Sequence, residues 1–390
     1  MPLLPPLSVD APVLAEADNP ATPPKKRGLL AWMASALDWL FGFVALIALL
    51  AACSVIPVLN FLSLGYLLHV SGTVARTGRL RDGFVGVRKA SVIGSVAAGV
   101  WLVVWPARLV AGFWRDAELV APGSGVARAW HAGLIALTIV TLLHLLWAGI
   151  RGGRLWHFLW PQPLRFRRWL REPRRFGKLQ DMLTNYVLGL RLPFYFWLGA
   201  RGFIGAFAWL IIPVGILMAA TRLPVGGSLL LSLPGGLLLF IVAIHLPFMQ
   251  ARFAESGRFR SVFELREVRR LFLRAPLAFW LALLTTLLLA VPLYLLKIEL
   301  TPQELAWLPS VLFVLFIFPA RLLTGWAVSR AKRREDPRHW FPRWIARLGI
   351  LPVALAYVLV VYFTPYLSWN GILSLLEQHA FLVPAPLMAL

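Results

Sequence analysis

The amino-acid sequence predicts an all-α protein, a polytopic transmembrane helical bundle of about eight or nine segments. Of the 390 residues, 59% are hydrophobic and 14% are charged, whereas a soluble domain carries about 25% charged residues. Apolar residues also form long blocks, such as residues 41–68, which contain no charged side chain. A helix of roughly 20 such residues crosses the hydrocarbon core. The strict alternation of a membrane barrel is absent, which favours helices.

Nine charge-poor blocks are the candidate membrane segments. They cover residues 36–56, 58–73, 91–113, 129–150, 200–220, 228–250, 276–296, 306–328 and 348–368. Pro57 and Asn60 predict a break or tight turn between the first two. Because the second block is short, a re-entrant piece is the alternative interpretation of it.

Residues 1–27 are rich in proline and alanine and carry acids before their first base. A secretory signal would instead begin with positive charge. We expect a disordered cytoplasmic tail that ends in a basic anchor, Lys25–Arg27.

Lysine and arginine residues gather in alternate loops, and this predicts the orientation. With the N-terminus inside, the five inside pieces hold 3, 5, 9, 7 and 7 bases, which makes 31 of the chain's 39, whereas the outside loops hold four. Those pieces are residues 25–27, 75–89, 151–178, 252–274 and 330–347. Such an excess marks cytoplasmic loops. We therefore expect a bacterial cytoplasmic membrane protein with its N-terminus inside and its C-terminus outside.

The formal net charge of +22 then lines one membrane face, where anionic headgroups attract each base by about 1 kcal/mol. Membrane lipids, above all those with anionic headgroups, are the expected partners. Residues 157–178 interleave aromatic side chains with arginine, as single-strand nucleic-acid binders do. Between two spans, an interfacial segment with its tryptophans at headgroup level is the favoured interpretation. No nucleic-acid partner is expected.

Two polar stretches, "ARTGRLRDGF" (75–84) and "AESGRFRSVF" (254–263), repeat Ala, Gly, Arg, Arg and Phe in register. The same shift of about 179 residues places the third candidate segment on the seventh and the fourth on the eighth. Residues 182–199 are extra in the first half. This order predicts a parallel internal repeat of four segments. The predicted domains are a tail (1–27), a leading helix (28–56), a first repeat (57–227) with a basic cytoplasmic loop (151–180), and a second repeat (228–390). Similar loops after unrelated spans are the alternative.

The repeated motif predicts a helix end in each copy. Gly78 and Gly257 suit a helix C-terminal turn with positive φ. The arginines that follow would lie at headgroup level, and residues 261–272 would form an amphipathic helix lying on the cytoplasmic leaflet. The candidate anionic-lipid contacts are therefore Arg79, Arg81, Arg258, Arg260, Arg269 and Arg270.

Motifs for chemistry are missing from the sequence. We identify no catalytic, cofactor-binding or metal-binding residues, and we expect neither an enzyme nor a cofactor. His144 and His245 lie one per span, which favours buried polar contacts over metal ligation. Arg108 and Arg321 are the other intramembrane polar candidates, and snorkelling to the headgroups accounts for them. Pro234-Gly235-Gly236 predicts the strongest break within a span.

Residues 56–84 contain Pro57, Asn60, Gly65 and Tyr66 before the arginine-rich turn. This arrangement resembles a pattern in uncharacterised bacterial polytopic membrane proteins of the domain-of-unknown-function type. The resemblance implies a membrane location and no particular activity.

The leading hypothesis is a non-enzymatic multi-pass protein that engages anionic lipid through its basic cytoplasmic face, as an envelope or assembly component. The alternative is a small-solute or lipid transporter built on the two repeats. A water-accessible cavity between the repeats, lined by Arg108 or the Pro234 break, would favour transport. A dry, closely packed interface would favour the structural role.

Overall fold

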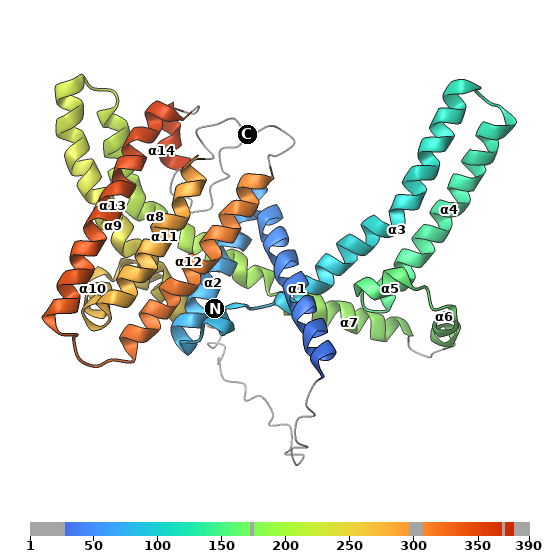
Figure 1. Ribbon diagram of the computed structural model, residues 1–390, viewed down its shortest axis with the longest axis horizontal. Helices are drawn as coiled ribbons and strands as arrows, with labels where there is room; N and C mark the ends of the chain where they lie inside the picture. Colours follow the sequence, from blue (N-terminus) through green and yellow to red (C-terminus); the bar gives the residue numbers. More distant parts are fainter. Residues whose placement is uncertain (1–27, 172–174, 296–306, 369–370, 378–390) are drawn as a thin grey trace, which may run out of the picture. The chain divides into compact units, whose positions relative to one another are not determined.

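The computed structural model describes residues 28–171, 175–295, 307–368 and 371–377, and every regular element within them is a helix (Figure 1). Contacts divide the chain into two units, Met1–Asp38 and Trp39–Leu390, and the second unit contains the helical bundle. The long helices are α1 (Leu29–Val55), α2 (Asn60–Thr77), α3 (Val87–Val120), α4 (Gly125–Ile150), α8 (Leu192–Ala220), α9 (Val225–Ser256), α11 (Pro276–Leu295), α12 (Leu308–Lys332) and α13 (Trp340–Leu367). The shorter elements are η1 (Leu80–Gly83), α5 (Leu155–Leu159), α6 (Pro163–Leu170), α7 (Arg175–Gly189), η2 (Phe259–Phe263), α10 (Leu265–Arg274), η4 (Gly371–Leu373) and α14 (Ser374–Glu377).

Within the described residues, seven helical stretches are long and apolar enough to cross a membrane, and an eighth arises if α10 and α11 form one bent span. The seven are Trp32–Val55, Val87–Val120, Gly125–Ile150, Leu179–Ala220, Val225–Ser256, Leu308–Lys332 and Trp340–Leu367. This confirms an all-α, multi-pass membrane protein. Of the nine predicted segments, the second is not among these stretches, and the seventh, residues 276–296, counts only as part of the bent pair.

That second segment is α2, a helix of 18 residues, about 27 Å long, buried at the centre of the bundle. It packs against α8, α9 and α12. The predicted turn before it is present, since Val58 adopts a positive φ of 71° between the ends of α1 and α2. Small residues allow the close packing: Gly65 meets α8, Gly72 meets α9, and Gly325 of α12 meets α2. α2 contains polar and small residues, which lower its hydropathy. A helix can carry such residues when protein rather than lipid surrounds it.

The predicted break at Pro234 is wrong. α9 is one continuous helix through both Pro234 and Pro247. Gly235 is buried, and a side chain there would run into Ile216 and Leu217 of α8. The glycine therefore serves close helix packing instead of a break, and membrane helices tolerate an internal proline.

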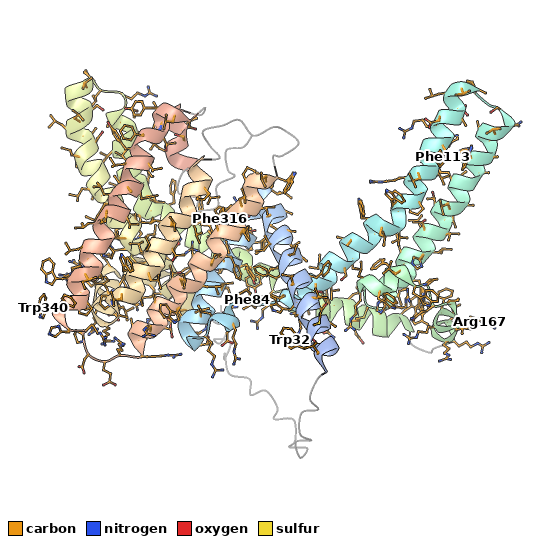
Figure 2. The ribbon with its side chains drawn as sticks, viewed as in Figure 1. Trp32, Phe84, Phe113, Arg167, Phe316 and Trp340 are labelled. Carbon is orange, nitrogen blue, oxygen red and sulfur yellow. The ribbon has the colours of Figure 1, made fainter. Side chains whose placement is uncertain are left out.

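α3 and α4 form an antiparallel pair whose side chains are largely exposed, among them Phe113 (Figures 1 and 2). Ser124 caps α4 by accepting a hydrogen bond from the backbone N–H of Ala127 at 3.1 Å. Only 17% of the apolar stretch of α4 is buried, against 61% for α12, its counterpart in the predicted repeat. The two halves of that repeat are therefore packed differently, and the duplication stays a prediction.

α10 is amphipathic, as predicted for residues 261–272, and protein covers part of its apolar side. Val268 and Leu271 are buried, and α10 contacts α9, α11 and α12. A bend of 113° joins α10 to α11. Part of this apolar side therefore packs on protein, because the bend folds α10 back onto its own bundle, and the position of α10 on the leaflet stays a prediction.

Candidate functional site

The two copies of the repeated motif end their helices in the same way. α2 ends at Gly78 with φ 72°, and α9 ends at Gly257 with φ 68°. Each glycine donates its backbone N–H to the carbonyl four residues earlier, of Val74 and Phe253 respectively. The left-handed conformation explains why glycine stands there, since side chains disfavour it. This confirms the predicted turns.

The residues after each glycine also adopt matching conformations. Arg79 and Arg258 are extended and precede the 3₁₀ turns η1 and η2. The backbone N–H of each donates to a hydroxyl two residues earlier, of Thr77 and Ser256, at 3.3 Å in both copies. The near match of Thr with Ser in the two sequences thus preserves one hydrogen bond.

Cationic side chains from neighbouring helices cap the ends of α2 and α9. Arg76 of α2 donates to the carbonyls of Ala254 and Glu255 in α9, at 3.2 and 3.0 Å. Arg333, just after α12, donates to the carbonyl of Thr77 at 2.7 Å. These carbonyls lack partners within their own helices, and cations there oppose the negative end of the helix dipole. The C-terminal ends of α2 and α9 therefore lie together.

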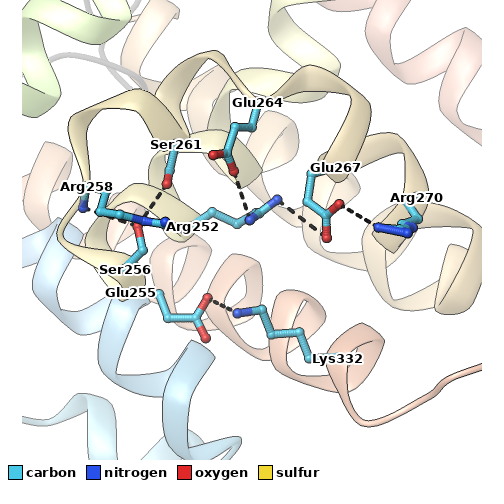
Figure 3. Close-up of polar contacts among 9 residues, drawn as sticks. All are labelled: Arg252, Glu255, Ser256, Arg258, Ser261, Glu264, Glu267, Arg270 and Lys332. Atoms are coloured by element: carbon cyan, nitrogen blue, oxygen red, sulfur yellow. Dashed lines mark hydrogen bonds and ion pairs between the residues drawn. The ribbon is translucent and has the colours of Figure 1, made fainter.

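Behind the second motif lies an ion-pair network (Figure 3). The buried Arg252 lies 3.0 Å from Glu264 and 3.8 Å from Glu267, and Glu267 pairs with Arg270 at 3.2 Å. Lys332 of α12 donates to Glu255 at 2.6 Å beside it. The network ties α9 to α10 across the intervening turn. Sequence reasoning missed Arg252, because its pairing depends on that turn and no local pattern marks it.

All six predicted lipid contacts are exposed. Arg81 lies 3.8 Å from Asp82, and Arg270 pairs with Glu267. The other four have no carboxylate contact among the described residues; they are Arg79, Arg258, Arg260 and Arg269. These six arginines and the helix-capping Arg76 and Arg333 form what we call the cationic layer, at the ends of α2 and α9 and on α10.

The four intramembrane candidates do not converge on one site. Arg108 is exposed on α3, beside a shallow hollow against α4. His144 lies with its Nε2 2.7 Å from the carbonyl of Phe158, and His245 bonds within its own helix to Ile241 at 2.8 Å. Both histidines thus make the polar contacts expected of them.

Arg321 differs from its prediction. It is 3% exposed, and its Nη1 donates to Oε1 of Gln250 in α9 at 2.7 Å. It therefore does not snorkel to the headgroups, because the surrounding helices enclose it and supply a polar partner.

The basic aromatic segment after α4 folds back onto the end of that helix. Arg151 donates to the carbonyls of Trp160, at 2.8 Å, and His157, and Trp147 donates to Pro161 at 2.6 Å. Burial lowers the pKa of His157, and the nearby Arg151 lowers it further. The arginines of α6, such as Arg167, are exposed (Figure 2).

A pocket of about 480 Å³ lies among α1, α2, the start of α3, and the turn between α7 and α8. We call it the α2–α8 pocket. Leucines, Ile93, Val85 and Ala90 form most of its wall, and no acidic residue lines it. Its polar lining residues are Cys53, Tyr66, His69, Lys89, Arg191 and Tyr195. Sequence reasoning did not predict it, because four separate segments meet there.

Most polar groups of the pocket are contiguous. The hydroxyl of Tyr66 donates to the carbonyl of Val85 at 2.7 Å, and its ring lies 5.7 Å from that of Tyr195. The ring of His69 lies 5.4 Å from that of Tyr195. Lys89, four residues after Val85, donates to the carbonyl of Gly189, close to Arg191 in sequence. The pocket therefore has a cationic, aromatic end and an apolar remainder. Among the described residues, no group of three or more His, Cys, Asp or Glu side chains is placed to hold a metal.

Residues 193–300 match the family described as "Protein of unknown function (DUF4013)". The match runs from the start of α8 through α11 and includes the second motif and the Arg252 network. The chain thus resembles an uncharacterised family, although residues 56–84, which carried the resemblance in the sequence, lie outside the match. No curated protein and no solved structure matches the chain.

Proposed function

We propose that this multi-pass membrane protein has no catalytic role and engages anionic lipid through its cationic layer, as an envelope or assembly component of a bacterial cytoplasmic membrane. The N-terminus would be cytoplasmic and the C-terminus outside. The observation that carries the proposal is the exposure of six arginines at the ends of the α2 and α9 segments and on α10. Four of them have no carboxylate contact within the described part of the chain. Lipid phosphates are the anions available at that depth.

Close packing between the halves supports this role over transport. α2 and α9 approach closely enough for Gly72 to lie against the backbone of Ala254. Pro234 lies in an unbroken helix, and Arg108 lies on α3, away from the contact between α2 and α9. In the described part of the chain, neither feature predicted for a transport pathway opens a cavity between the halves.

Lipid preference is measured with the full chain reconstituted in vesicles, using spin-labelled phosphatidylglycerol and phosphatidylcholine. At low salt we expect the association constant for phosphatidylglycerol to exceed that for phosphatidylcholine by about fivefold or more, since each surface arginine contributes about 1 kcal/mol. Salt should reduce the ratio by screening. Replacing Arg79, Arg258 and Arg260 with glutamine should bring the ratio toward one. The matched control replaces Arg115, Arg128 and Arg222, which are exposed on the predicted outer loops. Equal association constants at low salt would refute the proposal.

Orientation is tested by single-cysteine labelling in a Cys53→Ala background. Arg79→Cys and Arg258→Cys should react with a membrane-impermeant maleimide from the cytoplasmic side, whereas Ala121→Cys and Leu223→Cys should react from outside. All four positions are exposed and avoid the positive-φ glycines. Labelling of the first pair from outside would overturn the proposed orientation.

A further inference from the structure

We propose that the α2–α8 pocket binds one acyl lipid with an anionic headgroup. The inference rests on the proposed function and deepens it, because it adds one defined binding site to a broadly charged surface. The pocket volume of about 480 Å³ falls within the range of roughly 300–1,000 Å³ that ligand sites occupy. Ligand sites also combine mostly apolar walls with a few placed polar groups, as this pocket does.

The cationic end of the pocket selects the sign of the headgroup. Lys89 and Arg191 both line it, and no acidic residue does. The guanidinium of Arg191 has no hydrogen bond or ion pair within the described residues, and Lys89 bonds to a backbone carbonyl, which leaves its charge uncompensated. A phosphate or carboxylate there would receive charge-assisted hydrogen bonds from both side chains. Tyr66 and Tyr195 add two phenol groups to the lining, of which that of Tyr66 already donates to the carbonyl of Val85.

The remaining wall selects an acyl chain over a free anion. Leu46, Leu49 and Leu50 of α1, Leu62 of α2 and Ile93 of α3 offer no hydrogen-bonding side chain. Burying hydrocarbon against them is favourable, whereas an inorganic anion would leave this surface uncovered. α1 and α3 both belong to stretches that can span a membrane, so lipid is the amphiphile within reach.

The pocket also suggests a function for residues 182–199, which are extra in the first half of the sequence. Gly189, Leu190, Arg191, Leu192 and Tyr195 come from this segment and close one side of the pocket. Arg191 adopts a positive φ of 53° at the start of α8. Non-glycine residues adopt such backbone conformations where the surrounding structure requires them, often at binding sites.

Native mass spectrometry of the delipidated full chain tests the proposal. The protein is titrated with phosphatidylglycerol, with phosphatidylcholine of the same acyl chains, and with inorganic phosphate. We expect one phosphatidylglycerol to bind saturably, phosphatidylcholine to bind about tenfold more weakly, and phosphate alone not to bind. Lys89→Gln and Arg191→Gln should each weaken phosphatidylglycerol about tenfold. Arg88→Gln is the matched control, since Arg88 is exposed and does not line the pocket.

The only cysteine of the chain, Cys53, lines the pocket and provides a second readout that needs no variant. Bound phosphatidylglycerol should slow its reaction with N-ethylmaleimide, followed by intact mass. Equal binding of the two lipids, unsaturable binding of several lipids, or unchanged Cys53 reactivity would overturn the proposal. The surface variant at Arg79, Arg258 and Arg260 should keep the single bound lipid. Equal spin-label association constants for the unmodified chain, with the single lipid still bound, would refute the proposed function and leave this site standing.

Discussion

Replacing Gly65 with alanine is expected to lower the free energy of unfolding by about 3 kcal/mol or more, a severe overpacking defect. A Cβ at Gly65 would overlap the carbonyl oxygen of Tyr195 in α8, and one at Gly199 would overlap the carbonyl of Phe61 in α2. Both obstacles are backbone atoms, so no side-chain rotation relieves them. Gly199→Ala should therefore have an effect of the same size. Equilibrium unfolding in mixed detergent micelles, followed by tryptophan fluorescence, measures both.

Gly133→Ala is the matched control for these two variants. Gly133 lies in the interior of α4 with no atom within 4 Å of a built Cβ. There alanine should raise stability by up to about 1 kcal/mol through helix propensity alone. If Gly65→Ala were as stable as Gly133→Ala, α2 and α8 would not cross at these glycines.

Gln250→Leu is expected to destabilise the fold by about 2–3 kcal/mol, because it removes the acceptor of a hydrogen bond from a buried cation. Nη1 of Arg321 lies 2.7 Å from Oε1 of Gln250, and both residues are buried. Gln180→Leu, at an exposed position of α7, should change stability by less than about 0.5 kcal/mol. The same micelle unfolding assay compares the two.

The double variant Arg321→Met with Gln250→Leu shows whether the expected loss of stability comes from leaving the buried charge of Arg321 without its acceptor. Replacing both partners removes the buried charge along with its acceptor, and such replacements are often neutral or stabilising. We expect the double variant to recover most of the stability that Gln250→Leu loses. A double variant less stable than Gln250→Leu would mean that Arg321 contributes more through its other contacts than through this bond.

Features set by neighbouring residues were predictable from the sequence. The glycine turns at Gly78 and Gly257 followed from local conformational preference, and so did the turn after Pro57. The all-α membrane class followed from long apolar blocks, which reflect surroundings averaged over a whole helix.

Features set by distant residues were not predictable. The enclosure of α2 by protein could not be predicted, because the apolar and small residues of α2 do not distinguish a membrane span from a buried helix. Arg321 has the sequence position of a snorkelling residue, and its partner Gln250 lies 71 positions away. Arg252 meets Glu264 only because the chain turns sharply after Gly257. The α2–α8 pocket requires four separate segments, and spacing along the chain does not bring them together.

The enclosure of α2 has a consequence for biogenesis. Its final neighbours include α12, and its last carbonyl is capped by Arg333, which is synthesised 256 residues after Thr77. At ribosomal rates of about 5–20 residues per second, that interval lasts about 10 to 50 s. α2 therefore leaves the ribosome well before the helices that enclose it exist. Its polar residues must spend that time beside the insertion machinery or in lipid, and the bundle closes around α2 only after α12 has been inserted.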